Sequence, residues 1–270
     1  MTAHEIIDII ESVAPLSQQE GWDNSGLQVG QRETEVARVL LCTDIDEKII
    51  EEAVAKDCQM VISHHPLLFR GLKRIEGITR PERCVIKAIK NNIVLYSSHT
   101  AMDTYLYGVS GRMAEKLGIK DYKILSVSSP KNKVDDEVLP VGLGVIGYLP
   151  EKMTLYAFFD LLKVAFGVTA IRYVEKSFTD GSDNLVQKVA LCGGAGVEFT
   201  EQAIAQSADI YVTADVKYHD MQAVEGRINL CDIGHFESEQ YTKEIFAELL
   251  ANYNIDCVMA ENDVNLVKTY

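Results

Sequence analysis

The feature that most limits the fold of this 270-residue chain is the alternation of short apolar runs with helix-like segments. Strand-like runs occupy 36–45, 58–63 and 92–98, and a segment with helical spacing of its apolar residues follows each of them. Strands that are apolar at nearly every position are buried on both faces, and helices on both sides of a parallel or mixed sheet provide that burial. We therefore expect an α/β protein with mixed sheets flanked by helices.

A polar stretch at 128–142, which contains two prolines, interrupts this pattern. Prolines and clustered polar residues mark loops, so we place a lobe boundary there. The prediction is a first α/β lobe at 1–127 and a second at 128–230, with the segment 231–270 packing back on the first lobe. Further strands are predicted at 142–149, 168–175, 188–194, 209–215, 229–234 and 256–261, and helices at 154–166 and 237–253.

The composition restricts the classes of partner. Hydrophobic residues make up 47% of the chain and charged residues 24%, which is typical of a soluble globular protein. The net charge of −14 disfavours a nucleic-acid backbone as the main partner, and no apolar run is long enough to cross a bilayer. The segment 1–14 has the pattern of an acidic amphipathic helix, and the six cysteines include no CxxC pair. We expect a cytoplasmic protein with reduced thiols and no nucleic-acid or membrane partner.

The apolar run 61–63 ends in two adjacent histidines, His64 and His65, followed by Pro66. Neighbouring side chains of a strand point to opposite faces, and proline cannot continue a central strand. Both histidines are therefore expected in the loop at the carboxyl end of a buried strand, where α/β sheets bind their ligands. Because adjacent side chains diverge, each imidazole is expected to bind its own metal ion, with a carboxylate bridging the two ions.

Five of the six histidines share this location beside acidic residues at the ends of predicted strands. Three of the five have an acidic residue four positions away, in the pairs His99–Asp103, Asp215–His219 and His235–Glu239. Imidazole and carboxylate ligands suit divalent zinc, iron, manganese or nickel alike. The pattern therefore predicts a metal site without identifying the metal.

Two loops admit a structural and a functional interpretation. The glycine-rich segment 193–196 links a strand to a helix, so it either only forms that turn or presents N–H groups to an anion. The segment 21–30 contains Trp22, the only tryptophan, within a run of turn-forming residues. This segment either packs Trp22 in a structured turn or forms a wall of the active site.

These segments together resemble the GTP cyclohydrolase 1 type 2 homologue family, also called the Nif-three-like family. The resemblance extends from residue 22 to 239. It is carried by the stretches WDNSGLQVG, LLCTDIDEKIIEEAVAKDCQMVISHHPLLF, SSHTAMDTYLYGVSGRMAEKLG, CGGAG, DIYVTADVKYHD and DIGHFESE. The resemblance implies two α/β lobes with a dinuclear metal centre in the cleft between them, and a toroidal homohexamer.

The resemblance also implies a set of metal ligands. Matched motif by motif, the ligands would be His64, His65, Asp103, His235 and Glu239. His64 and His235 would hold one metal, His65 and Asp103 the other, and Glu239 would bridge them.

His99 and His219 would then be the catalytic histidines, which support the ligands or face the substrate. The chain departs from the family pattern at two places, where we expect a Gly-Asp pair and an acid or amide. These places hold Ala214-Asp215 and Ser110-Gly111, and both lie outside the implied ligands. The departures bear on substrate details more than on metal binding.

The leading hypothesis is a dinuclear, divalent-metal-dependent hydrolase in which metal-activated water attacks a small, nucleotide-like substrate. The family name implies opening of the GTP imidazole ring, but phosphoester or amide hydrolysis suits such a site equally. The alternative is a non-catalytic metal-binding scaffold or regulatory protein. A nucleic-acid-binding factor is disfavoured by the charge.

Overall fold

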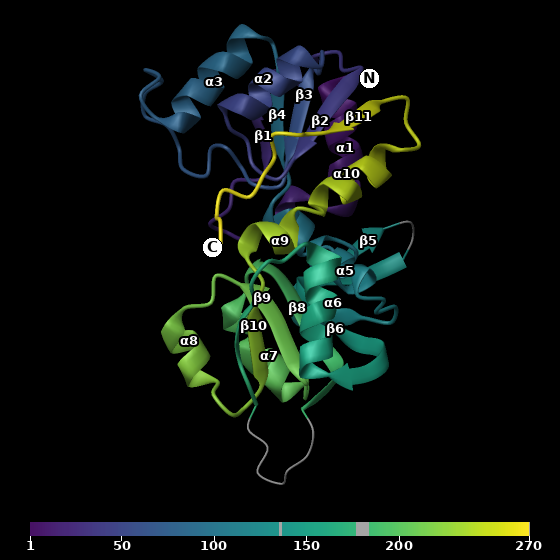
Figure 1. Ribbon diagram of the computed structural model, residues 1–270. Coiled ribbons are helices and arrows are strands. Elements are labelled where there is room, and N and C mark those ends of the chain that lie inside the picture. The colour runs from purple at the N-terminus through teal and green to yellow at the C-terminus, as the bar shows by residue number, and fades with distance from the viewer. Residues whose placement is uncertain (135–136, 177–183, 270) are drawn as a thin grey trace. The chain divides into compact units, whose positions relative to one another are not determined.

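The computed structural model describes residues 1–134, 137–176 and 184–269. The chain divides into two compact units, each built around its own sheet (Figure 1). Unit 1 comprises Met1–Thr104 and Gln240–Val264, and unit 2 comprises Tyr105–Glu239 and Asn265–Tyr270. Both sheets are mixed and flanked by helices, which confirms the predicted fold class. Within the described ranges, none of the helices combines the length and the apolar character that crossing a bilayer requires.

The sheet of unit 1 has the strand order β1-β4-β3-β2-β11. The strands β2, β3, β4 and β11 pair in parallel, and β1 pairs antiparallel with β4 at one edge. The pattern of apolar runs predicts all of them except β1, which lies in the glycine-containing segment that suggested only a turn. The strands are β1 (Gly26–Val29), β2 (Arg38–Cys42), β3 (Met60–Ser63), β4 (Val94–Ser97) and β11 (Asp256–Met259).

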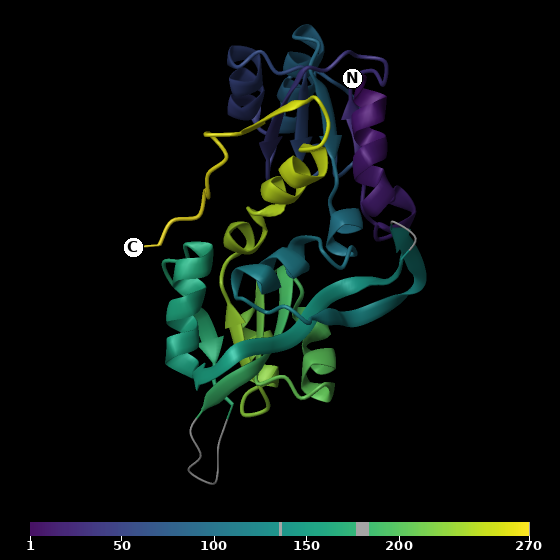
Figure 2. The same ribbon diagram turned by 90° about the vertical axis from the view of Figure 1, so that its right-hand side faces the viewer.

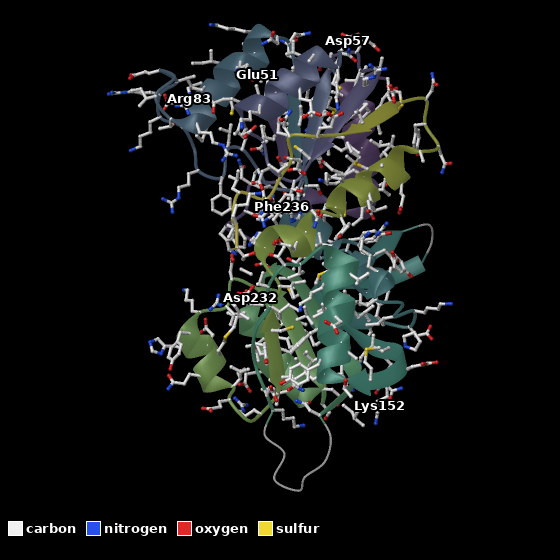
Figure 3. The ribbon with its side chains drawn as sticks, in the orientation of Figure 1. Glu51, Asp57, Arg83, Lys152, Asp232 and Phe236 are labelled. Atoms are coloured by element: carbon white, nitrogen blue, oxygen red, sulfur yellow. The ribbon has the colours of Figure 1, made fainter. Side chains whose placement is uncertain are left out.

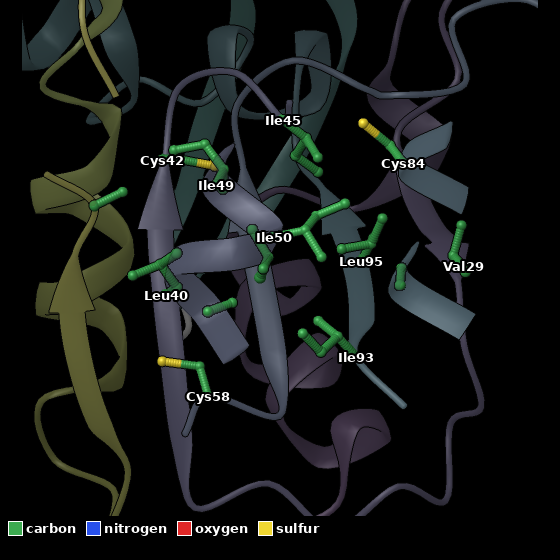
Figure 4. Packing of buried hydrophobic residues seen from close by; sticks show 14 of the residues in the cluster. Val29, Leu40, Cys42, Ile45, Ile49, Ile50, Cys58, Cys84, Ile93 and Leu95 are labelled. Atoms are coloured by element: carbon green, nitrogen blue, oxygen red, sulfur yellow. The ribbon is translucent and has the colours of Figure 1, made fainter. Parts of the chain in front are cut away.

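Helices cover both faces of this sheet (Figures 1 and 2). Successive residues of β4 show the two faces, because Leu95 belongs to the core under α2 and α3, whereas the Tyr96 hydroxyl donates to Glu11 of α1 at 3.4 Å. Figure 4 shows the core on the Leu95 face, where Leu40 and Ile50 also pack. The helices of unit 1 are α1 (Ala3–Val13), η1 (Leu16–Gln18), α2 (Glu47–Ala55), α3 (Arg80–Lys90), α4 (Thr100–Asp103) and α10 (Thr242–Leu250).

The sheet of unit 2 has the order β5-β6-β8-β9-β10-β7. The strands β8, β9 and β10 pair in parallel, and the pairs β5–β6, β6–β8 and β10–β7 are antiparallel. Aligned positions of these three strands, Ala190, Tyr211 and Leu230, face the core under α7 and α8. The strands are β5 (Lys123–Val134), β6 (Glu137–Thr154), β7 (Arg172–Val174), β8 (Leu185–Ala195), β9 (Ile210–Ala214) and β10 (Asn229–Asp232). The helices are α5 (Val109–Lys116), α6 (Leu155–Phe166), η2 (Val197–Phe199), α7 (Thr200–Ala205), α8 (Tyr218–Ala223) and α9 (His235–Glu239).

The predicted lobe boundary lies in the polar stretch 128–142. In the structure this stretch belongs largely to the paired strands β5 and β6. Antiparallel pairing uses backbone N–H and C=O groups, so polar composition does not prevent it. The first passage of the chain between the units falls earlier, between Thr104 and Tyr105.

The helical pattern at 237–253 is also interrupted in the structure. It is divided into α9 and α10, with a turn at Gln240 and Tyr241 between them. The chain passes from unit 2 to unit 1 between Glu239 and Gln240, at the start of this turn. No glycine or proline marks the turn, so the sequence pattern gave no sign of it.

A buried carboxylate fixes the chain that follows β11. Glu52 of α2 is 6% exposed and accepts hydrogen bonds from the backbone N–H groups of Glu261 and Asn262, at 2.8 and 2.9 Å. Lys56 Nζ lies 2.7 Å from the same carboxylate. Burial alone would raise the pKa of Glu52, but the contacts with Lys56 and the two N–H groups outweigh it and lower the pKa from 4.5 to about 2.

Replacing this carboxylate should destabilise the protein in a pH-dependent way. The lowered pKa means that the stabilisation is complete above about pH 4.5 and is lost as the pH falls towards 2. We expect Glu52→Gln to lower the free energy of unfolding at pH 7 by about 3 kcal/mol at most, with a smaller deficit at lower pH. Urea unfolding of both proteins at pH 7 and pH 4 checks this.

The neighbouring Glu51, labelled in Figure 3, provides a matched control. Its side chain is 62% exposed and forms an ion pair with Lys87 on the surface. Such pairs contribute roughly 0.2–1 kcal/mol, so Glu51→Gln should have a small effect. If Glu52→Gln lowers the free energy of unfolding by the same amount at pH 7 and pH 4, the role assigned to the Glu52 charge is contradicted.

Candidate metal centre

Two neighbouring parallel strands deliver the histidines of unit 1 to one edge of the sheet. Ser63 of β3 is aligned with Ser97 of β4, so the residues that follow these two positions lie together. His64, His65 and His99 each place a ring nitrogen within 4.8 Å of a ring nitrogen of the other two. The structure thus confirms that the strand ends gather imidazoles, and it identifies this triplet as a group that could hold a metal ion.

His64 is fully buried, and its orientation is set by the backbone. Its Nδ1 lies 3.2 Å from the carbonyl oxygen of Ser98, which can only accept a hydrogen bond, so Nδ1 carries the proton. The other nitrogen, Nε2, faces Oδ1 of Asp103 at 3.7 Å. Asp103 ends α4, the single helical turn that follows β4.

The two other histidines of unit 1 are oriented by carboxylates. His65 Nδ1 lies 3.1 Å from Oδ1 of Asp44, and His99 Nδ1 lies 2.8 Å from Oδ1 of Asp23. A carboxylate accepts the Nδ1 proton and leaves Nε2 as the atom that can bind a metal.

Asp23 is the most constrained of these carboxylates, with a side chain that is 0% exposed. Burial would raise the pKa of Asp23, but hydrogen bonds from His99 and Thr100 outweigh it and hold the pKa well below its usual range. The carboxylate therefore stays charged while it orients the His99 ring.

Unit 2 presents one histidine in the same manner. His235 begins α9, and its Nδ1 lies 2.9 Å from Oδ2 of Asp215. Its Nε2 lies 2.9 Å from Oε2 of Glu239, one helical turn further on. Asp215 thus contacts His235, although its four-residue spacing had suggested His219. Asp215 has a positive φ of 55°, a conformation that aspartate tolerates at turns.

The turn that delivers His235 is organised by Asp232 at the end of β10. Asp232 and Phe236, both labelled in Figure 3, bracket this turn. The Asp232 carboxylate accepts hydrogen bonds from the N–H of Gly234 and the N–H of Val216, both at 3.0 Å. One side chain therefore fixes the segment before His235 and the segment after Asp215.

The glycine-rich segment at the end of β8 provides space for Glu239. A Cβ atom at Gly194 would overlap Oε1 of Glu239, and Gly194 has φ +62°. The N–H groups of the segment bind hydroxyl oxygens, since Gly194 donates to Ser238 at 2.9 Å and Gly196 donates to Thr213 at 3.0 Å. Because these donors already have partners within unit 2, the structure favours the interpretation of the segment as a turn over its interpretation as an anion site.

One geometric rule describes all four of these histidines. Each Nδ1 faces an oxygen acceptor, which leaves Nε2 as the nitrogen that can bind a metal ion. In His235 and His64 the Nε2 atom also converges with a carboxylate oxygen, of Glu239 and Asp103 respectively. Two electron-pair donors face each other in this way when a proton or a metal cation lies between them. The residues thus fit a divalent cation with nitrogen and oxygen ligands.

His219 has a different environment from the other predicted site residues. It is exposed on α8, with Nδ1 3.3 Å from Oε1 of Gln222 and its ring against that of Tyr218. Its assignment as a catalytic histidine stays a prediction. Sequence reasoning missed the orienting role of Asp44 and Asp23, whose only sequence signal was a position at the end of an apolar run or in a turn.

The fold and these donor groups define an α/β protein with two mixed sheets and His/carboxylate groups that could bind metal. The family model for Duf34/NIF3 (NGG1p interacting factor 3) matches residues 1–265, and the chain belongs to this family. This confirms the resemblance drawn from the sequence motifs.

Known relatives agree with this assignment. A Clostridium perfringens protein named GTP cyclohydrolase 1 type 2 homolog is 36% identical over 240 residues, which span 88% of this chain and 87% of the relative. A Staphylococcus aureus hypothetical protein has a crystal structure that matches with a TM-score of 0.89 at 27% identity, covering 100% of this chain and 99% of that one. Reduced HcgD from Methanocaldococcus jannaschii matches with a TM-score of 0.76 at 25% identity, covering 97% and 98%.

The packing of Glu239 against Gly194 predicts a selective loss of metal affinity. Gly194→Ala should displace the Glu239 carboxylate and weaken binding of a divalent ion, in addition to a backbone penalty of about 1–2 kcal/mol for the left-handed conformation. Calorimetric titration with Zn²⁺ or Mn²⁺, together with urea unfolding, measures the two effects separately.

Gly167 is the matched control for this substitution. It has a similar φ of +68°, and a Cβ atom there would meet nothing within 4 Å. Gly167→Ala should therefore show the backbone penalty with unchanged metal affinity. If the two variants bind metal equally well, the proposed contact between Gly194 and Glu239 does not matter for the metal.

Proposed function

We propose that this protein is a dinuclear, divalent-metal-dependent hydrolase that acts on a small, nucleotide-like substrate. The ligands in this proposal are those that the family resemblance implies. They are His64, His65, Asp103, His235 and Glu239. The metal is zinc, iron, manganese or nickel, since mixed nitrogen and oxygen ligands accept each of them.

The observation that carries the proposal is the fixed orientation of the histidine rings. A metal-binding histidine almost always donates its other ring N–H to a carboxylate or a backbone carbonyl, which selects the tautomer and raises the basicity of the ligand nitrogen. His64, His65 and His235 each make such a contact, to Ser98, Asp44 and Asp215. A structural histidine on the surface needs no orientation of this kind.

The chemistry divides between the bound metals and the side chains. Two divalent cations would supply Lewis acidity and lower the pKa of water towards neutrality. Asp103 and Glu239 provide negative charge that balances the cations. His99, whose Nδ1 is held by Asp23, would exchange a proton through Nε2 as a general acid or base, and His219 is the second candidate for proton transfer.

The relatives' shared name, GTP cyclohydrolase 1 type 2 homolog, supports a nucleotide-like substrate for this chain. A shared site does not fix a substrate, so phosphoester and amide hydrolysis belong to the same proposal. Turnover of a nucleotide that disappears in Glu239→Ala would establish catalysis. A variant that loses metal but retains a binding partner would instead support a metal-binding scaffold or regulator.

Self-association into a homohexamer in the cytoplasm completes the proposal, and it rests on the family resemblance. Light scattering coupled to size-exclusion chromatography measures the assembly. A monomer at micromolar concentration would contradict the hexamer without affecting the metal assignment.

The metal content per chain should be about two and should fall to about one when a ligand to only one metal is removed. We expect this loss in His64→Ala and His65→Ala, because each histidine is assigned to a different ion. Plasma mass spectrometry on anaerobically purified protein gives the stoichiometry. Asp103→Asn, which conserves side-chain volume, tests the same centre without creating a cavity.

His4→Ala is the control, because His4 is an exposed histidine of unit 1 beside Asp8. It should keep the metal content of the wild type. Absence of metal from the wild type after incubation with excess divalent ions would exclude the mechanism and leave the paired histidines without their assigned role.

A further inference from the structure

Two large aromatic side chains are exposed beside the histidine triplet of unit 1. Trp22 is 59% exposed and Phe69 is 47% exposed, although both belong to the residue types that proteins usually bury. Their ring centroids lie 5.8 Å apart, and both rings contact the His99 ring, at 5.9 and 6.4 Å. His99 in turn lies 5.2 and 5.3 Å from His64 and His65. The aromatic pair, Trp22 and Phe69, therefore adjoins the candidate metal ligands through His99.

The loop that carries Trp22 is held by hydrogen bonds to a buried carboxylate. Asp23, the next residue, accepts from the backbone N–H of Thr100 at 3.0 Å and from its hydroxyl at 2.5 Å. It also accepts from Ser25 Oγ at 2.9 Å, and it binds His99 as described above. Trp22 is thereby attached to the segment that presents His99.

The loop that carries Phe69 is fixed to the Trp22 loop. Asn24 Nδ2 donates to the carbonyl oxygen of Leu68 at 2.7 Å, and Gln28 Oε1 accepts from the N–H of Leu68 at 3.1 Å. Both backbone groups of Leu68 are thus used to set the position of its neighbour Phe69. The polar residues of the segment 21–30 consequently hold the two exposed rings in a defined arrangement.

Exposed aromatic rings that are held in place in this way indicate a binding surface. Full burial of a large apolar side chain contributes roughly 1.5–3 kcal/mol, and part of this stabilisation is missing for each of the two exposed rings. The planes of the two rings are tilted by 53°, and exposed aromatic rings of this kind can stack against a third ring.

We propose that the aromatic pair binds a planar aromatic or heteroaromatic ring that carries an anionic group, and that it presents this ligand to the metal centre. Arg70 follows Phe69 directly and is exposed, and Lys73 and Arg74 follow on the same loop, with Glu76 as the only acid before residue 80. Arg74 forms an ion pair with Glu76 at 3.9 Å. The charges of Arg70 and Lys73 favour an anionic substituent on the ligand and disfavour a cationic one. The inference rests on the proposed function, because it names the substrate class of that site.

The single tryptophan of the chain makes the proposal directly measurable. Trp22 fluorescence should be quenched when adenosine monophosphate binds, whereas ribose phosphate, which lacks the ring, should leave it unchanged. Adenosine, which lacks the phosphate, should bind more weakly than the nucleotide. Phe69→Leu keeps the reporter and removes half of the surface, and it should weaken binding roughly 5- to 100-fold.

Three further variants test the role of Trp22 by calorimetry. Trp22→Leu should weaken adenosine monophosphate binding by a similar factor, and Trp22→Phe should retain most of it because a ring is kept. Tyr253→Leu removes an exposed ring elsewhere in unit 1, 44% exposed, and should have no effect. Equal losses for all three variants would overturn the proposal.

Metal content measured on the same samples separates this inference from the proposed function. If the protein holds metal but none of adenosine, cytidine or uridine monophosphate quenches Trp22, the ring site is excluded and the metal centre stands. If the nucleotides bind with the predicted variant pattern to a protein that takes up no metal, the ring site stands and the hydrolase proposal fails. Quenching by ribose phosphate equal to that by the nucleotides would exclude recognition of the ring.

Discussion

The hydrogen bond from an imidazole Nδ1 to a fixed oxygen is the interaction on which the candidate site depends. An imidazole on a strand end can rotate, and it binds a cation well only when one nitrogen is directed at it. In His65, His99 and His235 the acceptor is a carboxylate, and in His64 it is a backbone carbonyl. The surrounding structure holds the oxygen acceptors of these contacts in place.

The acceptors are themselves supported by the fold. Asp215 adopts a left-handed conformation at the end of β9, and Asp232 ties the backbone after it to the turn before His235. In unit 1, the side chain of Asp263 is almost fully buried. It accepts hydrogen bonds from the N–H and the hydroxyl of Thr43, the residue directly before Asp44. The aspartates that orient the histidine rings are therefore held in place by residues far away in sequence. Support of this kind fixes the direction of each metal-binding nitrogen.

The sequence predicts what depends on local patterns. Apolar runs indicate the strands of both sheets apart from β1 and most of β5, and the histidines at strand ends indicate the site. The partners of those histidines were not predictable in the same way, because Asp23 lies 76 positions from His99 and Asp215 lies 20 positions from His235. The only acids that sequence spacing can propose are those one helical turn away. This spacing paired Glu239 with His235, which the structure confirms. It also paired Asp215 with His219, whereas Asp215 contacts His235 in the structure.

Unit 1 is completed by a segment that lies far along the chain. The strand β11 pairs with β2, and α10 packs against α1 and β2, yet both follow Tyr105–Glu239, the larger segment of unit 2, in sequence. During synthesis the β2 edge therefore stays unpaired until residues 256–259 have left the ribosome, and an open edge strand is a template for incorrect pairing. A premature stop before Asp256 would spare every candidate ligand and still leave the first sheet incomplete. Unit 1 consequently cannot mature until Tyr105–Glu239 of unit 2 and the strand β11 have been translated.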